Sequence, residues 1–315
     1  MTADRAATVG RPTVSVAHAG RSFRERHGRV IDGYLFTAPF LLVYALVLVV
    51  PLIQGIWISL HDWQLLRGPV AFLGIDNYIR MVTRDPRFWT SLLHTVQFTI
   101  VSAPLVVGVG LLQALALNRA GRSTSILRGI FFSSYVLSIS VITLIWSLMY
   151  HPTSGILAEF LLSLGLQPIA WLSDPGLAMP AVIVTTIWWN AGFCTVVFLA
   201  GLQDIPASLY EAASLDGAGR LRSLAAITIP LLRRTFVLVF ITQVIWSFQI
   251  FGQVYLMTGG GPNNATRVLV QYVYETGLRG QNLGYASAMA TFLFGLMLVV
   301  SLVQYRAATH RGDEP

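Results

Sequence analysis

Residues 211–230 read Glu-Ala-Ala-Ser-Leu-Asp-Gly-Ala-Gly-Arg-Leu-Arg-Ser-Leu-Ala-Ala-Ile-Thr-Ile-Pro, and this stretch lies between two long apolar segments. Residues 207–215 predict a short helix, and residues 220–227 predict a second one. The pair Asp216-Gly217 predicts the turn between them, because glycine readily adopts a positive φ. The local sequence therefore indicates a helix–turn–helix that connects two apolar segments.

The ends of this segment carry their own signals. Asp204 is a candidate cap for the first helix, and Pro206 suits a helix start, where its missing N–H costs nothing. Pro230 predicts the end of the second helix, since the residue before a proline is biased away from helical geometry. Glu211 can pair or accept hydrogen bonds. Small side chains leave room for a partner surface at Ala212, Ala213 and Ala218.

The whole chain has the composition of a membrane protein. Its 315 residues are 55% hydrophobic and 11% charged, with a mean hydropathy of +0.65. Soluble domains carry roughly 25% charged residues, which cover their surface. The single cysteine, Cys194, excludes an intramolecular disulfide and is expected to be a small packing residue. No Cys/His cluster has metal-ligand spacing, so we expect no metal site.

Six long uncharged runs predict six transmembrane helices, and the expected fold class is an all-α integral membrane protein. The hydrocarbon core of a bilayer needs ~20 apolar residues of helix and offers backbone amides no water. The runs hold no Asp, Glu or Arg between their ends. They cover about residues 33–60, 89–118, 129–150, 176–200, 235–257 and 283–305.

The arginines predict the direction of these spans. All 21 basic side chains are arginine. Because they alternate with the spans and form no single stripe, the distribution favours membrane topology over nucleic-acid binding. By the positive-inside rule, both termini and the helix–turn–helix are cytoplasmic. Fifteen of the arginines lie in the segments assigned to that side, which are residues 1–32, 118–128, 201–234 and 306–315.

The predicted organisation has three parts. Residues 1–32 are expected to form a disordered cytoplasmic tail, and residues 306–315 a second cytoplasmic tail. Residues 33–305 form the six-helix domain, with the cytoplasmic loop at 204–230. A cleaved signal peptide is the alternative for the first apolar run, but that run is too long for the apolar region of a signal peptide.

The helix–turn–helix resembles the EAA coupling loop of the membrane subunit of bacterial ABC importers, and we call residues 204–230 the coupling loop. Ile229 departs from the leucine that this family often has before the final proline. Residues 201–218, 258–266, 171–175 and 284–288 are also similar to the sugar-type permeases, the group of the maltose-type and glycerol-3-phosphate-type importers. The residues that carry the coupling-loop resemblance are Glu211, Ala212, Ala213, Asp216, Gly217, Ala218 and Pro230.

The resemblance implies a type I importer permease fold in the bacterial cell membrane. The chain would be the permease subunit of an ATP-driven sugar importer and would form half of the translocation path. The implied partners are a second, similar permease, two P-loop ATPases and an extracytoplasmic sugar-binding protein. No Walker motif occurs in this chain. We therefore expect no enzyme activity and no bound cofactor here, with ATP and Mg in the partner ATPase.

The resemblance also places the substrate path on the fourth and fifth runs. Amides and hydroxyls can pair with sugar hydroxyls, and aromatic rings can cover apolar sugar faces. The structural alternative is that these polar groups hold helices together in the bilayer and do not contact a substrate. Gln249 and Gln253 are further amides on the fifth run. The predicted path residues are Thr186, Trp189, Asn190 and Phe193, then Gln243, Trp246, Ser247 and Ile250, of which Gln243, Ser247 and Ile250 share one helical face.

Other functions stay open at this point. An ion-coupled secondary transporter usually places charged residues inside its spans, and the six runs contain none. An ABC permease for another cargo, such as glycerol-3-phosphate, is a second alternative, although spans without arginine suit a phosphate poorly. The glycine-rich stretch at 258–266 is interpreted either as a tight turn alone or as a turn that also meets the binding protein.

Overall fold

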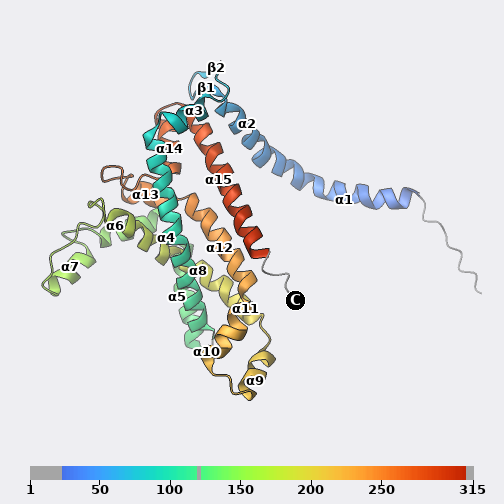
Figure 1. Cartoon of the computed structure of the whole chain (residues 1–315), viewed down its shortest axis with the longest axis vertical. Coiled ribbons are helices and arrows are strands. Elements are labelled where there is room, and N and C mark those ends of the chain that lie inside the picture. Colours follow the sequence, from blue (N-terminus) through green and yellow to red (C-terminus); the bar gives the residue numbers. More distant parts are fainter. Residues whose placement is uncertain (1–22, 119–121, 310–315) are drawn as a thin grey trace, which may run out of the picture. The chain divides into compact units, whose positions relative to one another are not determined.

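The computed structural model describes residues 23–118 and 122–309, which are built almost entirely of helices (Figure 1). The chain separates into two units, residues 1–54 and residues 55–315. Most of the predicted N-terminal tail, residues 1–22, lies outside the described residues, as do residues 310–315 of the predicted C-terminal tail.

The first unit is a long helix. α1 (Phe23–Tyr44) continues through a π-helical turn, η1 (Ala45–Val49), into α2 (Val50–Ser59), whose end belongs to the second unit. α1 begins at Phe23, so residues 23–32 of the predicted tail are helical. Most of the large apolar side chains between Tyr34 and Ile53 are exposed. Such a surface suits contact with lipid better than contact with water.

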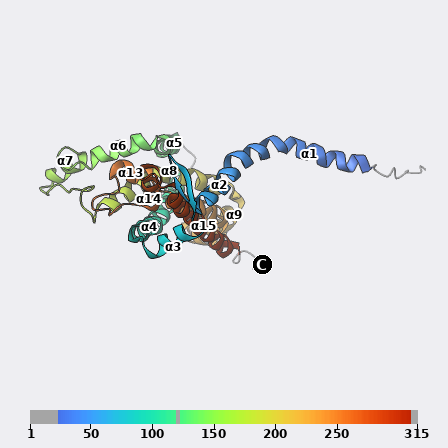
Figure 2. The same ribbon diagram turned by 90° about the horizontal axis from the view of Figure 1, so that it is seen from above.

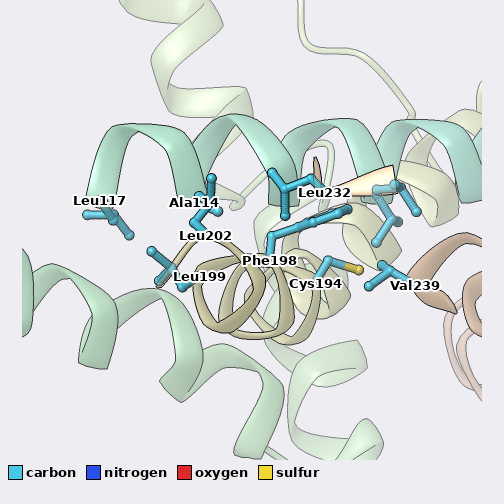
Figure 3. Packing of buried hydrophobic residues seen from close by; sticks show 10 residues of the cluster. Ala114, Leu117, Cys194, Phe198, Leu199, Leu202, Leu232 and Val239 are labelled. Atoms are coloured by element: carbon cyan, nitrogen blue, oxygen red, sulfur yellow. The ribbon is translucent and has the colours of Figure 1, made fainter. Parts of the chain in front are cut away.

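The centre of the second unit is the packing of α4 (Pro86–Leu117) against α8 (Ala178–Gln203). Figure 3 shows the side chains of this contact, with Cys194 and Phe198 of α8 facing α4. Gly110 of α4 allows the close approach, since a Cβ there would meet the Cβ of Cys194. Cys194 is fully buried, which confirms its prediction as a packing residue.

A second buried cluster joins α4 to α12 (Arg233–Phe248) and α15 (Leu283–Thr309). Phe88 of α4, Phe248 of α12 and Met289 of α15 are buried in it together. α4 therefore contacts α8 through the first cluster, α15 through the second and α12 through both, since Val239 belongs to the first and Phe248 to the second. This arrangement holds α8 and α12 in fixed positions on the same central helix.

Two of the predicted spans are not single straight helices. The run 129–150 contains the end of α5 (Arg122–Val136) and α6 (Ile139–Met149), which are bent by 100° at Leu137-Ser138. The run 235–257 contains most of α12 and then a separate α13 (Gly252–Met257). The prediction of one continuous helix is wrong for both, because hydropathy reports an apolar environment and not the direction of the axis.

The span count depends on how bent helices are treated. Four helices are long and apolar enough to cross a membrane, and six spans result if each of two bent pairs counts as one. The second pair is residues 220–231 with α12, bent by 64°. α6 and the following α7 (Ile156–Ser163) extend sideways, away from α4 and α15 (Figures 1 and 2).

The two ends of the second unit differ in structure. One end, which we call the hairpin end, contains an antiparallel pair, β1 (His61–Gln64) and β2 (Gly68–Phe72), with α3 (Asp76–Thr83) and α14 (Leu269–Tyr274) nearby (Figure 1). The hairpin is a local exception to the predicted all-α fold. The side-chain amide of Asn77 donates to the backbone carbonyls of Ser59 and His61 and so connects α3 to the start of the hairpin. The coupling loop lies at the opposite end (Figure 1).

Candidate functional site

A cavity of about 780 Å³ lies among α4, α5, α6, α8, α12 and α13. Its wall brings together seven of the eight residues predicted for the substrate path. α8 supplies Thr186, Trp189 and Asn190, and α12 with the residues after it supplies Gln243, Trp246, Ser247 and Ile250. Gln243, Ser247 and Ile250 all line the cavity, but α12 ends at Phe248. The predicted single helical face therefore holds only for Gln243 and Ser247, and Ile250 reaches the wall from the segment after the helix.

Phe193, the eighth predicted residue, does not line the cavity but supports its wall. Its ring lies 5.0 Å from the ring of Trp246 and 5.3 Å from the ring of Tyr135, centroid to centroid. Tyr135 of α5 is a wall residue that sequence reasoning missed, and its ring stacks on Trp246 at 6.3 Å. Tyr135 and Trp246 therefore form an aromatic side of the cavity, and Phe193 packs against both rings from outside the wall.

The segment between α12 and α13 and the start of α13 form another part of the wall. Helix α12 ends at Phe248, and the chain then places Gln249, Phe251 and Gln253 against the cavity. Gly252 begins α13 beside Ile139 of α6, where a Cβ would collide with the isoleucine side chain. The sequence contained a signal for these residues, since glutamines recur through the run 235–257, but a single straight helix could not place them together.

A second aromatic group joins two wall residues, Phe251 and Tyr255, to Tyr274 behind the wall. The ring of Phe251 stacks on that of Tyr255 at 5.1 Å and lies 5.2 Å from that of Tyr274. The Arg279 guanidinium donates to the Tyr255 hydroxyl at 2.6 Å and sits over both tyrosine rings. These contacts hold the segment after the break against the cavity.

Several polar groups of the wall have no partner within the described part of the chain. The Thr186 hydroxyl donates to the Val182 carbonyl, and the hydroxyls of Ser247 and Ser102 lie 3.3 Å apart. In contrast, the indole N–H of Trp189 is buried without an acceptor. The wall thus offers both satisfied hydroxyls and amide or indole groups that a ligand can pair with.

The coupling loop has the predicted helix–turn–helix form. α9 (Ala207–Leu215) has the predicted bounds, and Gly217 adopts a φ of +74°, which confirms the turn. The second part is α10 (Arg220–Ser223), a π-helical turn η2 (Leu224–Thr228) and α11 (Ile229–Leu231). Glu211, Ala212, Asp216 and Gly217 are exposed, and Ala213 and Ala218 are half-buried.

Two details of the coupling loop differ from the prediction. Asp204 follows α8 as its C-terminal cap and does not cap α9. The second helix does not stop before Pro230, because the wide turn of η2 ends there and the exposed Pro230 occupies the first turn of α11, where its missing N–H is tolerated. The hydroxyls of Tyr210 and Thr228 lie 2.9 Å apart and tie α9 to η2.

The hairpin end contains a hydrogen-bonded acid that sequence reasoning did not single out. Asp85 caps α4 by accepting from the backbone N–H groups of Arg87 and Phe88, and its other oxygen accepts from the hydroxyls of Tyr272 and Tyr285 at 2.7 and 2.6 Å. Partial burial raises the pKa of the Asp85 carboxyl, but these four hydrogen bonds outweigh it and the pKa lies below its ordinary value. Burial and the neighbouring carboxylate raise the pKa of Tyr272 to about 12.

Comparison with known proteins assigns the chain to a family. Residues 106–311 match the binding-protein-dependent transport system inner membrane component. The chain belongs to this family. It is therefore a multi-pass membrane protein, in agreement with its apolar helices.

Characterised members of the family resemble this inner membrane component over most of its length. It is 35% identical to the sulfoquinovosyl glycerol transport system permease SmoG of Agrobacterium fabrum, covering 86% of this chain and 88% of that protein. It is 33% identical to the trehalose/maltose permease MalF of Thermococcus litoralis, covering 89% and 95%. It is 31% identical to the lactose permease LacF of Rhizobium radiobacter, covering 94% and 100%.

A solved structure shares the fold of this inner membrane component. A chain of the bacterial alginate ABC transporter, in complex with its alginate-bound periplasmic protein, superposes with a TM-score of 0.82. The match covers 92% of this chain and 98% of that chain at 22% sequence identity. At this identity the likeness establishes the fold alone.

Proposed function

We propose that this chain is the permease subunit of an ATP-driven sugar importer and forms half of its translocation path. The observation that carries the proposal is the cavity, in which path residues from α8 and α12 converge. Its wall combines amides and hydroxyls with aromatic rings, which suits a ligand with both hydroxyl groups and apolar faces. The sugar permeases among its relatives support the same cargo class.

The proposed topology has six spans with both termini in the cytoplasm. The two bent pairs supply the third and fifth spans along the chain, and the arginine distribution supplies the direction. In this arrangement the coupling loop faces the side where ATP is available. The hairpin end then faces outward, where a binding protein delivers the sugar.

The proposed partners are a second permease of the same kind, two P-loop ATPases and an extracytoplasmic sugar-binding protein. ATP and Mg belong to the ATPases, and this chain performs no chemistry of its own. The exposed surface of α9 and of the turn after it, with Glu211, Ala212, Asp216 and Gly217, is the proposed docking site for an ATPase. Ala213, Ala218 and Pro230 shape the loop behind that surface.

The coupling loop leads through α11 directly into α12, a helix of the cavity wall, and this connection indicates how movement is transmitted. When ATP closes the ATPase pair, α9 moves, and the Tyr210–Thr228 contact passes the movement to η2. From η2 it reaches α11 and α12 through the 64° bend. α12 carries Gln243 and Ser247 in the cavity wall, so a displacement at the loop changes the wall directly. The result is alternating access of the cavity to the two sides.

Purification of the tagged full-length chain from its host in mild detergent tests this proposal. We expect mass spectrometry to identify a P-loop ATPase, a second permease and a sugar-binding protein in the complex. Proteoliposomes containing that complex should take up a sugar only when ATP is supplied. If the chain purifies alone and transports on an ion gradient without ATP, the proposal is wrong and the chain is a secondary transporter.

A further inference from the structure

The cavity wall contains two deeply buried glutamines whose amide nitrogens have no partner. Gln243 is 2% exposed and Gln253 is 8% exposed. Within the described residues, the only hydrogen bond of the Gln243 side chain is the one that its oxygen accepts from the Cys194 thiol at 4.0 Å, and the Gln253 side chain makes no hydrogen bond. Neither amide is fully sealed from solvent, so each keeps hydrogen-bonding capacity that a ligand in the cavity can use.

The two glutamines are joined by a third unpaired group. The indole N–H of Trp189 is buried in the same wall without an acceptor. These groups come from α8, α12 and α13, which are three separate helices, yet they line one cavity. A ligand that brings both hydrogen-bond donors and acceptors would satisfy all three.

The wall is also electrically neutral among the described residues. Its sixteen residues include no Asp, Glu, Arg, Lys or His. The cation that contacts it from behind, Arg279, is exposed and engaged with Tyr255. A carboxylate, sulfonate or phosphate placed in the cavity would lose its water without gaining a cation, and that desolvation is costly. Sugar hydroxyls meet no such penalty.

We infer that this cavity selects an uncharged glycoside and that Gln253, together with Gln243, is a specificity-determining residue. The inference rests on the proposed function, and it goes further by choosing among sugar classes. The relatives do not make that choice, because they include a lactose permease and a sulfoquinovosyl glycerol permease. The cavity volume of about 780 Å³ lies within the usual range of small-molecule sites, roughly 300–1,000 Å³.

The test measures sugar binding to the purified complex in lipid nanodiscs. The sugar-binding protein is left out, so that the signal reports binding at the membrane cavity alone. The probes are cellobiose, lactose and maltose, each compared with the uronic acid made by oxidising one terminal hydroxymethyl group to a carboxylate. Trp189 and Trp246 line the cavity, so tryptophan fluorescence reports occupancy. We expect at least one neutral disaccharide to bind saturably, and its uronic acid to bind at least about tenfold more weakly.

Variants of the two glutamines test whether these side chains cause the selection between neutral and acidic sugars. Gln243→Ala and Gln253→Ala should each weaken binding of the neutral sugar by roughly two- to tenfold, the loss of one hydrogen bond. Gln253→Arg should gain binding of the uronic acid, an effect that a merely structural role would not produce. The matched control is Gln97→Ala, at an exposed glutamine of α4 that is not part of the wall, and it should change nothing.

Each remaining outcome overturns a defined part of the reasoning. Equal binding of neutral and acidic sugars by the wild-type complex would overturn charge selection and leave sugar import intact. Unchanged affinity in Gln253→Ala, with no gain in Gln253→Arg, would remove the role of Gln253. If ATP-driven sugar uptake is intact but neither class binds, the cavity is not the selecting site. Absence of ATP-driven sugar uptake would instead refute the proposed function, and the inference with it.

Discussion

Gly217→Pro should uncouple the transporter, because the turn of the coupling loop depends on a backbone geometry that only glycine adopts freely. Gly217 has a φ of +74°, and its N–H donates to the Ser214 carbonyl at 3.1 Å. Proline has a φ near −65° and no N–H. Gly219, two residues later, has a φ of −69°, which proline matches, and provides the control.

The size of the effect follows from these geometries. Gly217→Pro loses one hydrogen bond and cannot adopt the observed φ, so the native turn is disfavoured by about 3 kcal/mol. The docking-competent loop would then be populated on the order of 100-fold less. Gly217→Ala keeps the hydrogen bond and meets no atom within 4 Å, so only left-handed strain of roughly 1–2 kcal/mol remains. Gly219→Pro fits the observed φ and should cost little.

The assay compares these three variants with the wild type in reconstituted proteoliposomes. We measure ATP hydrolysis stimulated by the binding protein and sugar, ATP-driven uptake, and the amount of ATPase that co-purifies. Gly217→Pro should abolish uptake and lower ATPase recovery, Gly217→Ala should be intermediate, and Gly219→Pro should resemble the wild type.

Two results would refute the reasoning. Wild-type coupling in Gly217→Pro would show that the turn does not position an ATPase contact. Equal damage from Gly219→Pro would show that the loop responds to any added rigidity and that the positive φ at Gly217 is not the cause. Thermal stability of each complex, followed by size-exclusion chromatography, separates these outcomes from simple failure to fold.

Three further predictions concern the cavity, the hairpin end and the helix contact. Gln243→Ala and Asn190→Ala should each reduce ATP-driven uptake several-fold while the complex still assembles; normal uptake in both would exclude this site as the path. Asp85→Asn should destabilise the purified complex by about 1–3 kcal/mol in thermal melts at neutral pH, because the hydroxyl donors lose a charged acceptor. The folded pKa of Asp85 lies below its ordinary value of 3.8, so the carboxylate stabilises the folded protein above that pH, and this stabilisation is lost as the pH falls through the folded pKa. The melting temperatures of the wild type and the variant should therefore converge only in acid. A difference that stays constant down to that pH range would contradict the role of Asp85. Gly110→Ala should lower the free energy of unfolding by roughly 1–3 kcal/mol, because the added Cβ forces α4 and α8 apart. The control Gly108→Ala, with no atom within 4 Å of its added Cβ, should be neutral or slightly stabilising. Equal stability of the two variants would contradict the close contact.

Features set by short-range interactions could be predicted from the sequence. The bounds of α9 and the turn at Gly217 follow from a proline, a glycine and the residues between them. Charge and hydropathy are additive along the chain, so composition alone indicated a membrane protein. The shared face of Gln243 and Ser247 followed from helical periodicity, which is also a local property, whereas Ile250 lies beyond the end of α12.

Features set by packing between distant segments were decided only by the tertiary structure. The bend at Leu137-Ser138 and the break after Phe248 leave hydropathy unchanged, because both sides of each break stay apolar. Gln253 reaches the cavity because Gly252 packs against Ile139, more than 100 residues earlier in the chain. Asp85 meets Tyr272 and Tyr285 for the same kind of reason, since no local pattern records which side chains the folded helices bring together.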